Sequence, residues 1–537
     1  MISTVQDHHG VPTLFVNNKP VPGFAYITYR TYNAQYEDFA ALGCRLFSVP
    51  VFFAGQTINE VSRIPPMTPG IFDGTEPDFA HFDSDIEQIL DACPDAWIFP
   101  RVNISLPYAW EEAHPDECCA FGYTEHHRAA FASDAWANET KRLLALFLDH
   151  VEGSAYREHI VGYQLACGNT EEWFPFDMRG GMGRRFDEAF HRYCLENGLS
   201  GTEEERLRFL SHVTVSRIEE LAAFAKEKSE RRLVIGCFYG YTMECTDPLT
   251  GHHALWELLH CDDIDFLCSP VSYAELRPVG MDHACMLPVD SLKEHGKLYF
   301  AENDTRTHLS KAPNDLPAYQ GPIWFGPDVD KSCAILKMHF ARALLHGHAM
   351  WWFDMWGHWY DHDRYRALLQ DCYRICAGAL EEDRRSLAEV AVFVDERAYA
   401  KADCDRGLCY GIRKTLGQLG TPYDIYLMDD FPAVKARYKA HIFLCPAETP
   451  AFVDATSMLQ DPLVICSLAV TTTDIQAYLQ KHSVHIWCEN AVVYGCGSYL
   501  FVHQIGSKTK VCTKPGVQLE PLWQEDSMSQ LYRITEA

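Results

Sequence analysis

The sequence predicts an α/β protein that begins with a (β/α)₈ TIM barrel, and two observations lead to this fold class. Amphipathic stretches such as 136–151 and 203–227 alternate with short apolar segments, and polar or aromatic clusters follow those segments. A barrel with large loops fits this alternation better than a doubly wound sheet, the competing architecture. The apolar segments number eight, as a barrel requires, and lie at 23–28, 45–49, 96–102, 160–165, 232–238, 264–268, 297–301 and 349–353.

An amino-terminal hairpin is expected before the first barrel strand. Apolar residues alternate on both sides of Asn17 and Asn18 within residues 13–22, and an Asn-Asn pair suits a tight turn. The charged run EEDRRS at 381–386 marks the expected end of the barrel. We therefore assign residues 1–385 to the hairpin and the catalytic barrel.

A second α/β pattern follows the charged run and predicts a Rossmann-like unit over residues 386–482. It has no G-x-G-x-x-G motif, so a nucleotide-dependent enzyme is not supported. Residues 483–537 are expected to form a small β-rich unit. The strands expected in these two units are 389–394, 423–427, 441–445, 463–467, 484–488, 491–494, 499–504 and 508–512, with helices at 411–419 and 473–481.

The composition excludes several classes of partner. A net charge of −28 repels nucleic-acid phosphates and anionic lipids, so a neutral substrate fits better. No segment resembles a signal peptide or a membrane span, and the 21 cysteines lack C-x-x-C spacing. We expect a cytoplasmic protein with free thiols, no cofactor and no metal; a zinc site from Cys261 or Cys268 with His260 is the alternative.

Two adjacent carboxylates, Glu171 and Glu172, follow the apolar segment 160–165. Asn169 can hydrogen-bond a sugar hydroxyl, and Trp173 can lower the local polarity and so raise the pKa of a neighbouring carboxyl group. A solvated loop is the plain alternative for an isolated Glu-Glu pair.

Glu302 directly follows the apolar segment 297–301, where a carboxylate needs hydrogen-bond donors or a cation. A neighbouring cation or several donors should lower the pKa of Glu302. The candidates are Arg306, His308, Asn303 and the tyrosines after the fifth and sixth segments, and a purely structural Glu302–Arg306 pair is the alternative. Asp304 is a candidate substrate ligand. Because barrel strands end at one rim, Glu172 and Glu302 are expected to face each other. Glycoside hydrolysis uses such a pair: one carboxyl group protonates the leaving oxygen and the other attacks the anomeric carbon.

Further candidate substrate ligands follow the other strands. The segment Ala349-Met-Trp-Trp-Phe-Asp-Met-Trp-Gly-His-Trp-Tyr360 mixes aromatic and acidic residues, which indicates stacking on a sugar ring, with core packing as the alternative. From this segment we select Trp352, Asp354 and Trp356. The remaining candidates are Arg101, Asn103, Tyr239, Tyr241 and Tyr273.

At these residues the sequence resembles glycoside hydrolase clan A, and its architecture is similar to that of the family 42 β-galactosidases over nearly the whole chain. The phrase Val161-Gly-Tyr-Gln-Leu165 looks like the entry to the clan's acid/base site. The resemblance implies a retaining, exo-acting enzyme with its acid/base after the fourth strand and its nucleophile, Glu302, after the seventh. It also implies a homo-oligomer, with a trimer favoured, formed through the Rossmann-like unit.

The sequence departs from the clan at one point. The clan has Asn directly before its acid/base Glu, whereas here Asn169 is followed by Thr170. We prefer Glu172 over Glu171 as the acid/base because Glu172 adjoins Trp173. A related family that acts on β-galactosides or β-mannosides fits as well as family 42 itself. The alternative from another class is a barrel that binds carbohydrate without cleaving it.

Overall fold

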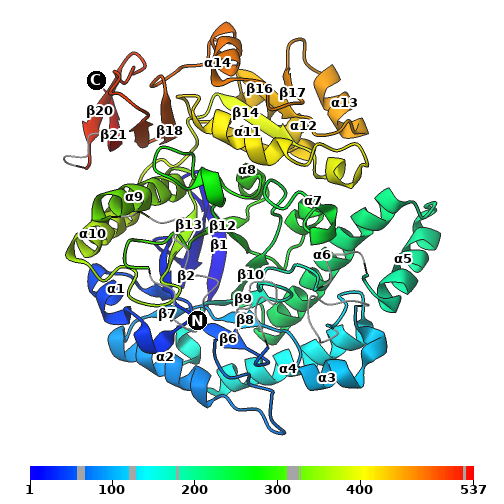
Figure 1. Ribbon diagram of the computed structural model, residues 1–537. Coiled ribbons are helices and arrows are strands. Elements are labelled where there is room, and N and C mark those ends of the chain that lie inside the picture. The colour runs from blue at the N-terminus through cyan, green and yellow to red at the C-terminus, as the bar shows by residue number, and fades with distance from the viewer. Residues whose placement is uncertain are drawn as a thin grey trace.

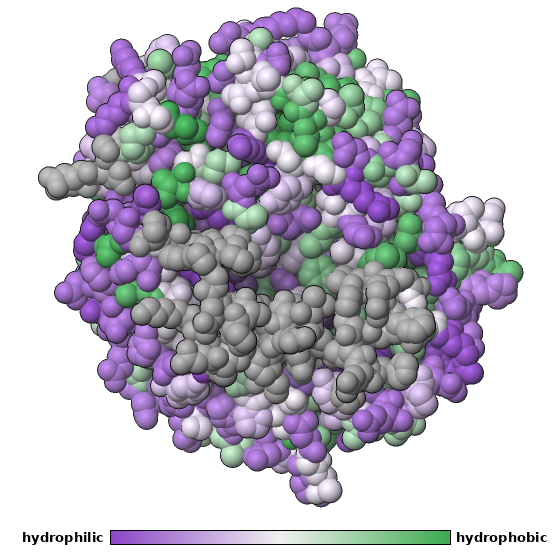
Figure 2. Space-filling view, in the orientation of Figure 1, coloured by the Kyte–Doolittle hydropathy of each residue, from purple (hydrophilic) through white to green (hydrophobic). Residues whose placement is uncertain are grey.

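The computed structural model describes residues 1–56, 67–119, 128–176, 181–310, 326, 328–523 and 528–536. A barrel forms the lower body of the molecule, and two smaller sheet units lie above it (Figure 1). Hydrophilic residues dominate the described part of the face drawn in Figure 2, as a net charge of −28 leads one to expect. None of the described helices combines the length and the apolarity that crossing a bilayer requires.

All eight expected barrel strands are present and parallel, which confirms the (β/α)₈ prediction. Two of them are split at a proline, which has no N–H to donate to the ladder. In spite of these breaks, Phe99 N still donates to Phe47 O (3.0 Å) and Arg101 N to Val49 O (2.9 Å), so the barrel closes. The strands are β4 (Phe24–Ile27), β5 (Leu46–Phe47) with β6 (Pro50–Phe52), β7 (Trp97–Ile98) with β8 (Arg101–Asn103), β9 (Gly162–Ala166), β10 (Val234–Phe238), β11 (Phe266–Pro270), β12 (Leu298–Asn303) and β13 (Ala349–Phe353).

Helices surround the barrel, and the two clearest sequence predictions correspond to α4 (Asp134–Gly153) and α6 (Glu203–Lys228). The start of α6 carries a capping box, in which Thr202 and Glu205 each satisfy a backbone N–H of the other. The other described barrel helices of five residues or more are α1 (Tyr36–Leu42), α2 (Ala80–Ala92), α3 (Tyr108–Ala113), α5 (Arg184–Asn197), α7 (Leu255–Leu259), α8 (Val289–Glu294), α9 (Val329–Leu345) and α10 (Asp363–Ala379).

The amino-terminal strands lie against the ends of the barrel strands opposite to the carboxyl ends. The expected hairpin is formed by β2 (Val11–Val16) and β3 (Lys19–Pro20), with Asn17 and Asn18 both at positive φ, as a type I′ turn requires. A further strand, β1 (Ser3–His8), extends this sheet and was not predicted. Its Ser3 N donates to Arg232 O (2.8 Å) just before β10.

The second unit is a four-stranded parallel sheet with the order β15-β14-β16-β17. Its four strands and the helices α11 and α14 fall where the sequence predicts them, whereas α12 and α13 were not predicted. They are β14 (Val390–Val394), α11 (Leu408–Gly417), β15 (Asp424–Leu427), α12 (Phe431–Val434), β16 (Ala440–Leu444), α13 (Pro450–Ser457), β17 (Leu463–Ile465) and α14 (Thr472–Lys481). The boundaries of this unit at 386 and 482 remain a proposal.

The carboxy-terminal unit is a four-stranded antiparallel sheet, but two of its expected strands are wrong. Residues 484–488 and 508–512 are not strands. The main-chain N–H of Trp487 instead donates to Gly420 O (2.9 Å), and its side chain packs beneath the sheet. This segment is apolar because it is buried, not because it pairs with a strand. The observed strands are β18 (Ala491–Cys496), β19 (Tyr499–Gln504), β20 (Val517–Pro521) and β21 (Ser529–Glu536).

Candidate active site

Glu302 is the last residue but one of β12 and is 5% exposed at the barrel rim. Its Oε2 accepts a hydrogen bond from Arg101 Nη2 of β8 at 2.5 Å and another from Trp351 Nε1 of β13 at 2.9 Å. Arg101 is itself fixed by Gln164 Oε1 of β9 at 3.0 Å. Three neighbouring or facing strands therefore hold one carboxylate in a single orientation.

The surroundings of Glu302 shift its pKa in both directions. Burial raises the pKa of Glu302, and the neighbouring Asp304 carboxylate raises it further, while Arg101 and Trp351 lower it by stabilising the ionised form. The expectation that Arg306 supplies the cation, and that the pKa is low, therefore needs correction. Arg306 is buried, but the guanidinium bonded to Glu302 belongs to Arg101.

The loop after β9 has a strained backbone. Thr170, Glu171 and Trp173 all adopt positive φ, between 61° and 68°, which costs on the order of 1–3 kcal/mol each. Trp173 is fully buried; its N–H donates to Cys167 O at 2.7 Å, and its Nε1 donates to Leu165 O at 3.0 Å. The buried indole anchors the loop and so sustains the strain that sends the two adjacent glutamates in different directions.

Glu172 is the more exposed of the two adjacent glutamates. Its carboxylate accepts hydrogen bonds from Thr170 Oγ1 at 2.6 Å and Tyr241 OH at 3.1 Å. His252 Nε2 donates to the Glu172 main-chain oxygen at 2.9 Å. Burial raises the pKa of Glu172 to about 8, with a further upward contribution from the charge of Glu302. A carboxyl group with this pKa holds a proton at neutral pH.

Glu171 points into a different environment. It is 1% exposed, and Tyr29, from the loop after β4, donates its OH to Glu171 Oε2. Burial raises the pKa of Glu171 to about 7, against the lowering influence of Arg101, Tyr29 and Asn103. Glu171 thus shares the electrostatic surroundings of Arg101 and Glu302.

Asp304 and Tyr273 complete the described rim near the three glutamates. Asp304 is 5% exposed and forms an ion pair with Arg277 at 2.6 Å. The Tyr273 ring centroid lies 4.3 Å from the same Arg277 guanidinium, and burial and the charges of Asp304 and Glu172 raise the pKa of Tyr273. These contacts bring Arg101, Asn103, Glu171, Tyr273 and Asp304 together with the two candidate catalytic residues.

Three candidate ligands are not brought to this site. Trp352 is fully buried on the outer side of β13, against Phe24 (5.5 Å between ring centroids) and Tyr360 (5.8 Å). Asp354 accepts hydrogen bonds from Tyr26 OH and Trp359 N, both at 2.8 Å, and so braces the loop after β13. Tyr239 donates its OH to Gly251 O at 2.8 Å.

Two further candidates, Asn169 and Trp356, lie beside the site. Asn169 is 7% exposed and its N–H donates to Phe174 O at 3.0 Å, which closes the loop after β9. Trp356 is 3% exposed, with its ring centroid 6.3 Å from that of Tyr29.

Sequence reasoning missed Tyr29, Trp351 and the main-chain anchor His252, which contact the glutamates, and Gln164, which holds Arg101. A signal existed for Trp351: alternate residues of a strand face the same side, and Trp351 shares its side of β13 with Phe353, which lies under the Arg101 guanidinium (5.2 Å). Tyr29 and His252 lie in loops without such periodicity.

Metal binding has one geometric candidate among the described residues. Ligand atoms of Asp290, His346 and Asp424 lie within 4.8 Å of one another. However, Lys293 Nζ bonds to Asp290 Oδ1 at 2.6 Å, and Asp424 accepts hydrogen bonds from Ser386 at 2.7 Å and Tyr438 at 2.8 Å. This cluster is therefore explained as a buried polar network between α8 and β15.

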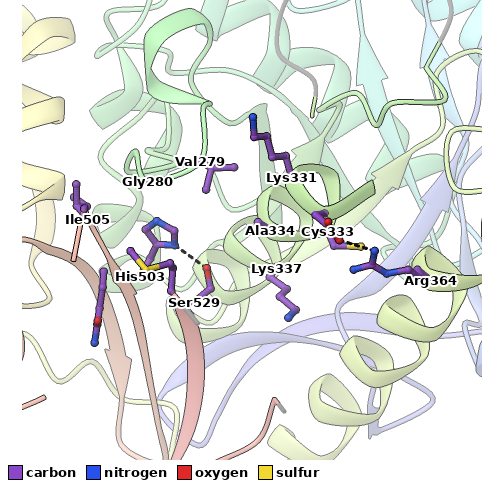
Figure 3. A pocket seen from close by; sticks show the side chains of 14 residues that line it. Val279, Gly280, Lys331, Cys333, Ala334, Lys337, Arg364, His503, Ile505 and Ser529 are labelled. Atoms are coloured by element: carbon purple, nitrogen blue, oxygen red, sulfur yellow. Dashed lines mark hydrogen bonds and ion pairs between the residues drawn. The ribbon is translucent and has the colours of Figure 1, made fainter. Parts of the chain in front are cut away.

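One cavity lined by described residues lies apart from the glutamates. It has a volume of about 700 Å³, and none of its lining residues is a candidate site residue. Figure 3 shows His503 and Ser529 of the carboxy-terminal sheet on one side and Lys331, Ala334 and Lys337 of α9 beside them.

Comparison with solved structures shows that the chain has the fold of family 42 β-galactosidases. It is similar to a β-galactosidase from the psychrophilic Marinomonas ef1 (12% identity, 95% of this chain and 99% of that one, TM-score 0.63). It is also similar to a β-galactosidase from Bacillus circulans sp. alkalophilus (10%, 96% and 99%, 0.63) and to an exo-carrageenase of family 42 from Bacteroides ovatus (11%, 100% and 86%, 0.58). No protein-family model and no curated protein sequence matches the chain.

Proposed function

We propose that the protein is a retaining, exo-acting β-glycosidase that hydrolyses β-galactosides or β-mannosides. The observation that carries this proposal is the pair of carboxyl groups at the rim, Glu302 bonded to Arg101 and Glu172 with a pKa raised to about 8. In these different environments Glu302 would act as the ionised nucleophile and Glu172 as the protonated acid. A barrel that only bound sugar would not require this division.

In the proposed reaction, Glu302 attacks the anomeric carbon while Glu172 donates its proton to the departing glycosidic oxygen. The C–O bond to the leaving group breaks, and a glycosyl ester of Glu302 forms. Glu172, now ionised, removes a proton from water, whose oxygen attacks the same carbon and releases Glu302. No cofactor takes part. The likeness in fold to proteins described as β-galactosidases and as an exo-carrageenase supports the substrate class.

A panel of nitrophenyl β-glycosides tests the activity, and NMR of the product tests its stereochemistry. We expect cleavage of the galactoside or the mannoside, with the β-anomer of the free sugar appearing first. An α-anomer as the first product contradicts the retaining mechanism, and no cleavage of any glycoside in the panel contradicts the proposed function.

The pH profile of kcat/KM is expected to be bell-shaped, and the charge of Asp304 is expected to set the pH of both of its limbs. Activity falls above about pH 8, because Glu172 then loses the proton it must donate. The Asp304 charge raises the pKa of both Glu172 and Glu302, so Asp304→Asn should move both limbs to lower pH. Limbs that stay in place in this variant contradict the electrostatic account.

We also propose that the enzyme is a cytoplasmic homotrimer assembled through the sheet unit of β14–β17. The free state of its 21 cysteines suits a reducing compartment. The assembly follows from the family resemblance, and light scattering is expected to give about three times the 61.2 kDa chain mass. A monomer at micromolar concentration contradicts this assembly.

A further inference from the structure

The loop after β11 connects the rim of the barrel to the second unit. This loop carries Tyr273 and Arg277, whose guanidinium lies against the Tyr273 ring and which is 1% exposed. Arg277 bonds to Asp304 at 2.6 Å and donates to Thr305 Oγ1 at 3.2 Å, both directly after β12. The position of this loop therefore determines where Asp304 and Tyr273 lie.

Arg277 also holds its own loop in shape. Its Nε donates to Ser272 O at 2.9 Å and its Nη2 to Val271 O at 2.7 Å, and its guanidinium lies 4.3 Å from the Tyr273 ring centroid. A buried cation with this many acceptors cannot shift alone, so the loop moves as one body with Arg277.

Glu244, in the loop after β10, holds the backbone of the same segment. Its Oε1 accepts a hydrogen bond from Tyr273 N at 3.2 Å, and its Oε2 accepts one from Ser272 Oγ. Glu244 can hold these two groups only if its own carboxylate is fixed, and its side chain is only 10% exposed, so a paired cation stabilises it there.

Helix α11 of the second unit supplies that cation. Arg413, 1% exposed, bonds to Glu244 Oε2 at 2.6 Å and donates to Cys285 O at 3.0 Å. One helical turn earlier, Tyr410 donates its OH to the main-chain oxygen of Tyr273 at 3.2 Å. Tyr410 thus contacts the loop that carries Tyr273 directly, whereas Arg413 acts on the backbone of Ser272 and Tyr273 through Glu244.

We propose that Arg413 and Tyr410 of α11 are positioning residues of the barrel's site, because they fix the loop after β11 so that Tyr273 and Arg277 lie against Asp304. The second unit is then a working part of the active site rather than only a packing or assembly element. The expected effect on kcat rests on the proposed function. The expected effect on the position of the loop does not depend on it.

Kinetics of the full-length chain test the consequence, using the nitrophenyl glycoside that the wild-type protein cleaves fastest. A displacement of about 1 Å in a positioning element costs on the order of 100-fold in rate, so Arg413→Gln should lower kcat about 100-fold. Tyr410→Phe loses one hydrogen bond and should lower kcat a few-fold. Arg413→Lys keeps a charge opposite Glu244 and should recover part of the loss.

Arg437→Gln is the matched control. Arg437 bonds to Glu294 of α8 at 2.6 Å, so it also joins the second unit to the barrel, but it contacts none of the site residues. We expect its kcat to stay within twofold of wild type. Thermal melting of each variant separates a loss of stability from a loss of positioning.

Hydrogen exchange supplies a readout that needs no substrate. The amides of residues 271–277 should exchange faster in Arg413→Gln and Tyr410→Phe than in the wild type or Arg437→Gln. Unchanged exchange and unchanged kcat in folded Tyr410→Phe and Arg413→Gln overturn the inference, as does an equal loss in Arg437→Gln. If the wild-type protein cleaves no glycoside, the proposed function fails and the exchange result alone decides the inference.

Discussion

Replacing Glu302 by glutamine is expected to lower kcat by about four orders of magnitude while leaving the fold intact. Glutamine keeps the shape of the side chain and can still accept the hydrogen bond from Trp351, but an amide does not attack an anomeric carbon. The measurement is kcat on an activated nitrophenyl glycoside, together with thermal melting to show that the variant is folded.

Glu396→Gln provides a matched control for this experiment. Glu396 is likewise 5% exposed, and it accepts backbone hydrogen bonds from Leu255 at 2.7 Å and Trp256 at 3.0 Å. It contacts none of the site residues, so its variant should keep kcat within about twofold. Near-normal turnover by Glu302→Gln removes Glu302 from the mechanism and leaves Asp304, the carboxylate two residues further on, as the next candidate for the nucleophile.

Replacing Glu172 by alanine is expected to cost about 10²–10⁴-fold in rate on substrates with poor leaving groups, because these need the proton. Activated nitrophenyl glycosides have leaving groups that need little protonation, so the glycosyl-enzyme should still form from them. Its hydrolysis should be slow, because Glu172 is no longer there to take a proton from water. Azide is small enough to occupy the space of the lost side chain and should restore turnover of these substrates by forming a glycosyl azide.

The adjacent Glu171 is the built-in comparison for Glu172. Tyr29 and Asn103 hold Glu171 on the Arg101 side of the site, so Glu171→Ala should weaken activity without azide rescue. If azide rescues Glu171→Ala and leaves Glu172→Ala unchanged, Glu171 is the acid/base and Glu172 is not.

The barrel could be predicted from the sequence because its strands are buried on both faces and so appear as short continuous apolar runs. The segment 349–353 coincides with β13, and 160–165 differs from β9 by two residues at its start and one at its end. The predicted segment 297–301 stops two residues before the end of β12, so Glu302, expected directly after the strand, is its last residue but one. Strand pairing in the last fifty residues was harder, because Trp487 and its neighbours are apolar through burial without being part of a ladder.

The side chains that line the site were predicted less well than the strands that carry them. Trp352 and Asp354 share one side of β13 and its continuation, and that side faces the helices, whereas Trp351 faces the glutamates. Choosing between them requires knowing which alternate residues of the strand face the barrel interior. A strand that is apolar on both faces does not show this in its sequence. Arg101 was recognised, but its partnership with Glu302 depends on two strands 201 positions apart in the chain.

The most direct test of the account is the trapping of the covalent intermediate. A 2-deoxy-2-fluoro β-glycoside of the cleaved sugar slows both steps, and a good leaving group lets the first step proceed, so the glycosyl-enzyme accumulates. Mass spectrometry of the digested protein should then find one sugar adduct, on the side chain of Glu302. An adduct on Asp304, on Glu172 or on Glu171, or an inactivated protein with no adduct, contradicts the assignment of Glu302 as the nucleophile.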